Sequence, residues 1–273
     1  MKKTSDHTKP FLKWAGNKYP IIDRIQRLLP DGQRLLEPFI GSGAVFLNTD
    51  YDSYLLTDNN PDLINIYQHL KDEGEVFIRY CKRFFTDQYN NAETYYKRRE
   101  EFNRTKNLRK KAALFLYLNR HGYNGLCRYN SKGGYNVPFG RYKRPYFPAK
   151  EMLAFHLKAQ RAEFRLADFS TCMQQARAGD VIYCDPPYYP LSPSASFTAY
   201  SAGGFSELQQ HQLAQLARDC RQRQIPVLIS NHNTQFTLDV YSDAQLASFK
   251  VRRYISCHGN KRGLAGELLA LYA

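Results

Sequence analysis

The sequence predicts an α/β fold in which a parallel sheet of the nucleotide-binding type is interrupted by a basic, mainly helical insertion. Three observations support this: a strand, glycine turn, helix, strand and acid follow one another near the start, a similar strand begins at residue 180, and a positively charged helical stretch lies between them. The chain has 273 residues, of which 43% are hydrophobic, so it is long enough to bury a core and too apolar for general disorder.

The first 60 residues contain the opening βαβ pattern. A turn of sequence EPFIGSG, which includes Glu37, Phe39, Gly41 and Gly43, follows the first strand, and Asp58 ends the second. Glycines allow a ligand to approach the backbone, and an acid after the second strand suits ribose hydroxyls. The complete GxGxxG is absent, which favours a nucleoside-like ligand over a pyrophosphate. The expected elements are a helix over 20–29, a strand over 34–37, a helix over 44–48 and a strand over 54–57.

Residues 61–150 form the expected insertion. Helices dominate there, including one over 108–120, and an irregular stretch rich in Gly, Tyr and Asn follows over 121–147. From Lys97 to Lys150 the chain has fifteen Lys or Arg residues and only two acids, although the net charge of the whole chain is only +14. Six tyrosines lie in the same region. A solvated basic face would explain the charge alone, whereas basic and aromatic residues together favour nucleic-acid binding.

The α/β alternation returns in residues 151–273, which should complete one domain with residues 1–60. A strand is expected over 180–184, before Asp185-Pro186-Pro187-Tyr188. A helix should follow over 206–223, because Ser206 and Gln209 have capping-box spacing and its apolar residues share one face. Further strands are expected over 226–230, 246–256 and 267–272.

The DPPY sequence is the strongest candidate for a reactive site. It follows a hydrophobic strand, and ligands in open α/β sheets bind at the carboxyl ends of strands. The two prolines make a stiff turn without N–H donors. The Asp185 carboxylate and the Pro186 carbonyl could therefore accept both hydrogens of an adenine N6 amine while Tyr188 stacks on the base. A turn that merely ends a strand is the competing interpretation.

Several segments in order resemble the Dam family of DNA adenine methyltransferases, of the enterobacterial type. They are FLKWAGNKY (11–19), EPFIGSG with Asp58, LFLYLNRHGYNGLCRYN (114–130), NVPFGRYKRPYFP (136–148), DPPY and PVLISNH (226–232). The resemblance runs from about residue 11 to 272. It implies a Rossmann-like S-adenosylmethionine-dependent fold with an inserted DNA-recognition domain, methylation of the flipped adenine of GATC in double-stranded DNA, and roles in mismatch repair and replication control.

The resemblance also implies roles for individual residues. Asp185, Pro186 and Tyr188 match the catalytic turn. S-adenosylmethionine would be bound by Trp14, Lys18, Glu37, Phe39, Gly41, Gly43, Asp58, Asp168 and Asp185. DNA would be contacted by Lys13, Tyr123, Asn124, Leu126, Arg128, Pro138 and Arg141, with Arg128 reading a base and Tyr123 inserted into the base stack. Departures from the family are Asn17, where a glycine is common, a poor match at Asp168, and an end at Ala273 without a polar tail.

Three other functions remain open at this level. An RNA or protein-glutamine methyltransferase would commonly have Asn in place of Asp185. An inactive DNA-binding protein would be expected to lose the acid or the cofactor glycines, which are present. A methylase of a restriction system would use identical chemistry.

Composition limits the remaining possibilities. No apolar run reaches the length of a membrane span, and the first ten residues lack an apolar signal core. None of the six cysteines has metal-like spacing. We therefore expect a cytoplasmic, nucleoid-associated monomer without disulfides, bound metal or membrane contact.

Overall fold

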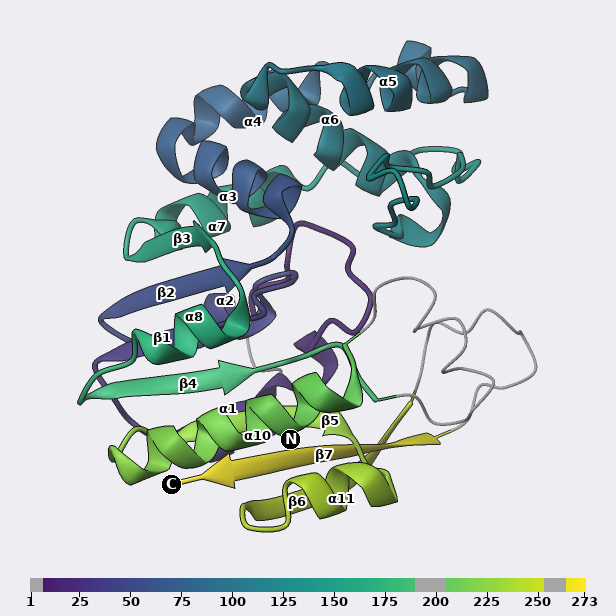
Figure 1. The fold of residues 1–273 in the computed structure, drawn as a ribbon. Coiled ribbons are helices and arrows are strands. Elements are labelled where there is room, and N and C mark those ends of the chain that lie inside the picture. The colour runs from purple at the N-terminus through teal and green to yellow at the C-terminus, as the bar shows by residue number, and fades with distance from the viewer. Residues whose placement is uncertain (1–6, 190–204, 253–263) are drawn as a thin grey trace, which may run out of the picture. The chain divides into compact units, whose positions relative to one another are not determined.

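The computed structural model describes residues 7–189, 205–252 and 264–273 (Figure 1). The chain divides into two compact units, each of which is built from several segments. Unit 1 comprises Met1–Asp23, Ile40–Asp50 and Asp58–Leu166, and unit 2 comprises Arg24–Phe39, Tyr51–Thr57 and Ala167–Ala273.

A seven-stranded sheet of order β3-β2-β1-β4-β5-β7-β6 confirms the predicted α/β class. Strands β1, β2, β4 and β5 are parallel, and β7 pairs antiparallel with both β5 and β6. The parallel strands are short apolar runs with nearly every residue buried, as expected when both faces of a sheet are covered. The strands are β1 (Arg34–Glu37), β2 (Ser53–Asp58), β3 (Ala162–Leu166), β4 (Asp180–Cys184), β5 (Val227–His232), β6 (Gln245–Arg252) and β7 (Leu264–Tyr272).

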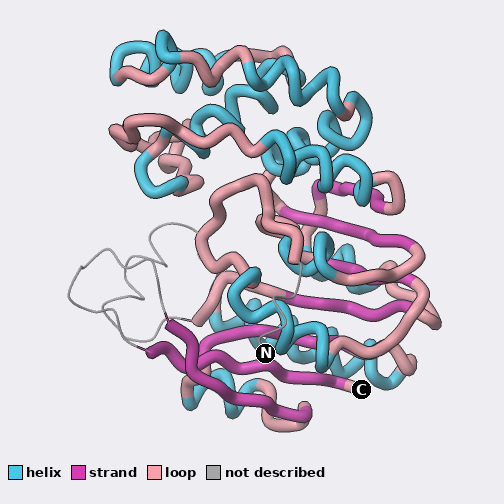
Figure 2. Tube along the Cα trace, turned by 180° about the vertical axis from the view of Figure 1, so that it is seen from behind, coloured by secondary structure: helices cyan, strands magenta, loops and turns pink. Residues whose placement is uncertain are grey.

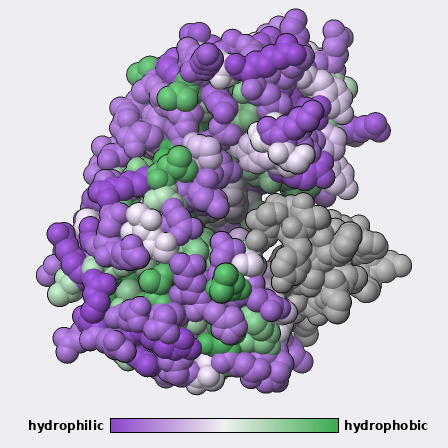
Figure 3. Space-filling view, viewed as in Figure 1, coloured by the Kyte–Doolittle hydropathy of each residue, from purple (hydrophilic) through white to green (hydrophobic). Residues whose placement is uncertain are grey.

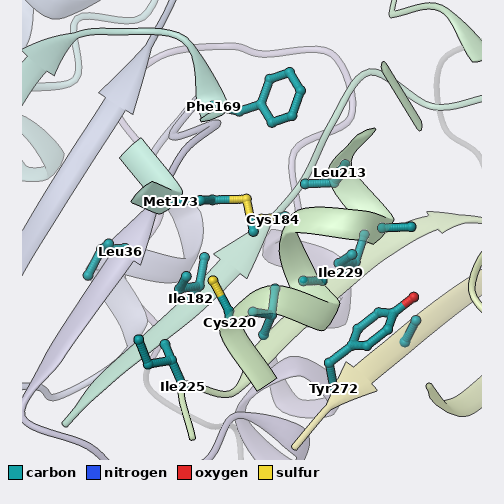
Figure 4. Packing of buried hydrophobic residues seen from close by; sticks show 14 of the residues in the cluster. Leu36, Phe169, Met173, Ile182, Cys184, Leu213, Cys220, Ile225, Ile229 and Tyr272 are labelled. Atoms are coloured by element: carbon teal, nitrogen blue, oxygen red, sulfur yellow. The ribbon is translucent and has the colours of Figure 1, made fainter. Parts of the chain in front are cut away.

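The core of unit 2 lies between this sheet and the helices α8 (Phe169–Gln174), α10 (Glu207–Gln222) and α11 (Gln235–Val240). Leu36, Ile182 and Ile229 from the strands pack with Met173 and Leu213 from the helices (Figure 4). Helix α10 begins with the predicted capping box of Ser206 and Gln209. Helices α8 and α10 lie side by side over one face of the sheet (Figure 1).

Unit 1 is mainly helical. Between β2 and β3 the chain forms helices and loops without a strand, apart from two isolated bridges (Figure 2). Helix α6 is buried continuously over its last ten residues, because it packs against α3, α4 and α5. The visible face of these helices is largely hydrophilic (Figure 3). The helices are α2 (Ala44–Asn48), α3 (Pro61–Glu73), α4 (Glu75–Lys82), α5 (Ala92–Arg104), α6 (Leu108–His121) and α7 (Ala149–Ala159).

The expected elements are found with small shifts of their ends. The helix expected over 20–29 is a 3₁₀ turn, η1 (Tyr19–Ile21), followed by α1 (Ile22–Leu28). The end of the strand expected over 246–256 lies outside the described residues. No helix within the described ranges is long and apolar enough to cross a membrane.

Candidate active site and nucleic-acid interface

Four acidic or histidine side chains end or follow strands whose carboxyl ends lie at the same edge of the sheet. Strands β1, β2, β4 and β5 run parallel in adjacent positions, so their carboxyl ends share one edge. Glu37 ends β1, Asp58 ends β2, Asp185 follows β4 and His232 ends β5. The sequence predicts a ligand site at these carboxyl ends.

Asp185 is half-buried and held by its neighbour on β5. Ser230 Oγ donates a hydrogen bond to Asp185 Oδ1 at 3.0 Å, and Tyr183 Oη lies 3.0 Å from the same Ser230 hydroxyl. Pro186 is buried and Pro187 is exposed. The carboxylate is therefore fixed by a hydrogen bond from the neighbouring strand and by the rigid turn that follows it.

Buried amides fix the rest of this turn. Gln210 Nε2 donates to the Pro187 carbonyl at 3.2 Å, and Asn231 Oδ1 accepts from the Tyr189 amide at 3.1 Å. Gln210 and Asn231 are essentially inaccessible and bond to each other and to the Tyr241 hydroxyl. His232 Nδ1 lies 2.7 Å from the Tyr189 carbonyl, which can only accept, so the proton belongs on Nδ1. Hydrogen bonds from α10 and β5 therefore hold the backbone at Pro187 and Tyr189.

Tyr188 lies against β5 and β7. Its hydroxyl donates to Glu267 Oε2 at 2.7 Å, and its ring meets His232 edge to face with centroids 4.5 Å apart. Burial, together with the charges of Asp185 and Glu267, holds the pKa of the Tyr188 hydroxyl well above its usual range. The hydroxyl therefore stays neutral. The His232 ring and the Glu267 carboxylate together fix the orientation of the Tyr188 ring.

In unit 1, Gly41 brings together two of the predicted cofactor residues. Its amide donates to Asp58 Oδ2 at 3.2 Å, and its backbone has a φ of +47°. A Cβ at this position would lie 2.9 Å from Trp14 Nε1. Only glycine therefore allows the indole to approach the backbone this closely.

Asp58 is the acid of this group. Desolvation by burial raises the pKa of its carboxyl, and backbone amides of Asn60, Gly41 and Asn59 act in the opposite direction. Its Oδ1 accepts from the Asn60 amide at 3.0 Å. A carboxylate has about four lone-pair directions, so backbone bonding leaves capacity for a ligand hydroxyl.

The other predicted cofactor residues are distributed over both units. In unit 1, Lys18 is buried with Nζ 2.5 Å from the Gly16 carbonyl, and Gly43 precedes α2 with a φ of +72°. In unit 2, Glu37 is buried at the end of β1. Phe39 stacks on Phe169 with centroids 5.5 Å apart.

Asp168 has a local task that the sequence did not predict. Its carboxylate caps α8 by accepting from the Ser170 amide at 2.9 Å and the Ser170 hydroxyl at 2.7 Å. The side chain is exposed. Asp168 directly precedes Phe169 in the chain, and the Phe169 ring stacks on Phe39.

Most of the predicted DNA contacts gather in one part of unit 1. The Tyr123 amide bonds to the Pro138 carbonyl at 2.8 Å, and Gly125 packs so closely on Lys13 that a Cβ would meet its side chain at 2.4 Å. Asn124 and Arg141 both have positive φ, and both are exposed. Leu126 is half-buried, and Tyr123, Arg128 and Pro138 are exposed.

Lys13 is held at the edge of this surface. Asn119 of α6 accepts from the Lys13 amide at 2.9 Å and donates to its carbonyl at 2.7 Å. The Lys13 ammonium lies 4.2 Å from the centroid of the Tyr142 ring. Burial and, to a smaller extent, the charge of Arg120 lower the pKa of Lys13.

Sequence reasoning missed the residues that support these sites. Gln210 could have been found, because it lies three, four and seven residues before the apolar positions 213, 214 and 217 of α10 and so shares their face. Asn119 similarly interrupts an apolar helix. Ser230 and Asn231 lie in the PVLISNH segment (226–232), but no local pattern distinguishes their roles, and Glu267 carries no signal at all. Among the described residues, no group of three or more His, Cys, Asp or Glu is arranged to hold a metal ion.

Comparisons with known proteins give a consistent result. The family model described as "D12 class N6 adenine-specific DNA methyltransferase" matches residues 14–255. The chain is 51% identical over 264 residues to the DNA adenine methylase of Escherichia coli K12, covering 97% of this chain and 95% of that protein. The DNA adenine methylase of Serratia marcescens is 52% identical, covering 97% and 98%, and that of Vibrio cholerae O395 is 50% identical, covering 97% and 96%.

Proposed function

Because the chain belongs to the D12 class of N6 adenine-specific DNA methyltransferases, we propose that it methylates the adenine of GATC in double-stranded DNA, with S-adenosylmethionine as the donor. Family membership makes it a DNA adenine methyltransferase with a donor of the S-adenosylmethionine type. The donor itself, the recognition site and the residue roles are the proposal. The observation that carries it is the Asp185 carboxylate, fixed at the end of β4 by Ser230 and a rigid Pro-Pro turn.

The proposed chemistry relies on positioning. The Asp185 carboxylate and the Pro186 carbonyl accept the two N6 hydrogens, which turns the nitrogen lone pair toward the methyl group, and Tyr188 stacks on the base. S-adenosylmethionine supplies an electrophilic methyl group. Transfer would form the N6–C bond as the sulfur–carbon bond breaks, leaving S-adenosylhomocysteine, and the surplus N6 proton would pass to solvent along its hydrogen bond to the Asp185 carboxylate. The adenine must leave the duplex beforehand.

The donor would be bound by the residues that the family resemblance implies. The structural support is the close packing of the Gly41 backbone on the Trp14 indole, together with the Asp58 carboxylate, whose remaining hydrogen-bonding capacity suits a ribose hydroxyl. Lys18, Glu37, Phe39, Gly43 and Asp168 remain assigned by resemblance to the family.

The DNA would be read by the surface of unit 1 around Lys13, Tyr123 and Arg128. We propose residues 61–150 as the recognition segment and residues 1–60 with 151–273 as the catalytic segment. The excess positive charge between Lys97 and Lys150 supports this division. The proposal includes a monomer that acts on chromosomal DNA in the cytoplasm, with the repair and replication roles that the family resemblance implies.

Replacing Arg128 with alanine should weaken discrimination at one base pair of the site. An exposed arginine can bind guanine O6 and N7 together, so its loss should reduce discrimination by about 1–3 kcal/mol at that position. The measurement is kcat/KM on GATC and on duplexes in which each base pair is replaced in turn. Discrimination equal to that of the unmodified protein at all four positions would contradict this role.

The proposed function is tested by methyl transfer from labelled S-adenosylmethionine to two duplexes, one with a single GATC site and one with that site scrambled. Label on N6 of adenine in the GATC duplex alone would support the donor, the reaction and the recognition site together. Equal label on both duplexes would overturn GATC recognition. No label on either duplex, with the donor present in excess, would overturn the donor assignment.

A further inference from the structure

Arg128 lies on a short hairpin formed by residues 126–136. Tyr129 and Tyr135 face each other in an isolated antiparallel bridge, and the Asn136 amide donates to the Arg128 carbonyl at 3.0 Å. Arg128 Nε donates to Asn136 Oδ1 at 2.8 Å, which directs the guanidinium. The position of this arginine therefore depends on how the hairpin is attached to the rest of unit 1.

Both neighbours of Arg128 in the chain are attached to the start of α3. The Tyr129 hydroxyl donates to Asp62 Oδ2 at 2.8 Å, and Asn60 Nδ2 lies 3.7 Å from Cys127 Sγ. Asn60 also caps α3, since its Oδ1 accepts from the Asp62 and Leu63 amides. The two residues that flank Arg128 are thus bonded to one rigid helix end.

The Asp62–Tyr129 contact has features of a specific attachment. Asp62 is only 6% exposed, and its other carboxylate oxygen pairs with Lys111 Nζ of α6 at 2.8 Å. Placing a carboxylate in a buried position is costly unless both oxygens are bonded. Burial, with further contributions from Cys127 and Asp62, raises the pKa of Tyr129, so the hydroxyl remains a donor at all working pH values.

We propose that Tyr129 and Asp62 are positioning residues for sequence recognition: their hydrogen bond ties the Arg128 hairpin to α3 and so determines where the guanidinium meets the base. This inference rests on the proposed role of Arg128 in reading DNA. Because the bond runs to a carboxylate it is stronger than a neutral hydrogen bond, and its loss should reduce discrimination about tenfold.

The test is Tyr129→Phe, which removes only the hydroxyl. Relative kcat/KM is measured on GATC and on duplexes in which each base pair is replaced in turn. We expect about tenfold weaker discrimination at the base pair that Arg128→Ala affects, and unchanged discrimination at the other three. Tyr51→Phe is the matched control, because Tyr51 is a buried tyrosine whose hydroxyl likewise donates to one acceptor, the Pro30 carbonyl at 2.7 Å, in unit 2. It should leave discrimination unchanged.

The double variant separates positioning from a general loss of stability. In the Arg128→Ala background, Tyr129→Phe should cause no further loss of discrimination, since it acts through the arginine. An additional independent loss, or an equal fall of kcat/KM on every duplex, would overturn the positioning role. Changed discrimination in Arg128→Ala with normal discrimination in Tyr129→Phe would overturn this inference alone. Normal discrimination in Arg128→Ala would instead overturn the proposed function of Arg128.

Discussion

Asp185→Ala should lose about a hundredfold to a thousandfold in methyl-transfer rate while retaining its affinity for DNA. The carboxylate is the only charged acceptor in the DPPY turn, and without it the adenine amine keeps its lone pair conjugated with the ring. The substitution also leaves the Ser230 hydroxyl without one acceptor, which should lower the free energy of unfolding by only about 1 kcal/mol. DNA affinity should persist because the contacts proposed for it lie in unit 1.

Single-turnover transfer from labelled S-adenosylmethionine measures the rate, and fluorescence anisotropy of a labelled duplex measures DNA binding. Asp219→Ala is a suitable control, because Asp219 is a carboxylate on α10 that accepts a hydrogen bond from Gln215 four residues earlier on the same helix. It should transfer methyl groups at the normal rate. Turnover by Asp185→Ala close to that of the control would refute the catalytic assignment. A parallel loss of DNA binding would show that the turn supports more than the chemistry.

The sequence was informative where local pattern and chain order determine structure. The strand that ends at Asp58, the glycine turn before α2 and the strand before Asp185 all follow from apolar runs punctuated by glycine, proline and acids. Because these strands pair in parallel, their carboxyl ends necessarily lie at one edge of the sheet. This is why the core of the candidate site could be predicted.

The supporting side chains could not be predicted, because their partners are remote in the chain. Asn119 binds the backbone of Lys13 across 106 positions, and Asp62 binds Tyr129 across 67. Such long-range contacts depend on tertiary packing, which periodicity does not encode. Strand β3 differs: its charged and apolar residues alternate over five positions, a local strand signal that was overlooked in the sequence.

Gly41→Ala should weaken S-adenosylmethionine binding by about tenfold or more, because the added methyl group would displace both Trp14 and the backbone amide that bonds to Asp58. The new Cβ would lie 2.9 Å from Trp14 Nε1 and 3.1 Å from Trp14 Cδ1, so the indole must move. The positive φ adds about 1–3 kcal/mol of backbone strain. Relief of that strain would shift the Gly41 amide, which bonds to Asp58 Oδ2. A displacement worth about 1.4 kcal/mol corresponds to a tenfold change in affinity.

Gly133→Ala controls for a general loss of stability caused by an alanine at positive φ away from the donor site. Gly133 has a φ of +76°, and a Cβ there would meet nothing within 4 Å, so this variant carries the backbone cost without the clash. Isothermal titration calorimetry measures donor affinity in both variants without relying on Trp14. Normal donor affinity in Gly133→Ala and weak affinity in Gly41→Ala would attribute the loss to Gly41 and its contacts with Trp14 and Asp58. Equal losses would attribute it to general destabilisation, and normal affinity in both would remove Gly41 and Trp14 from the donor site.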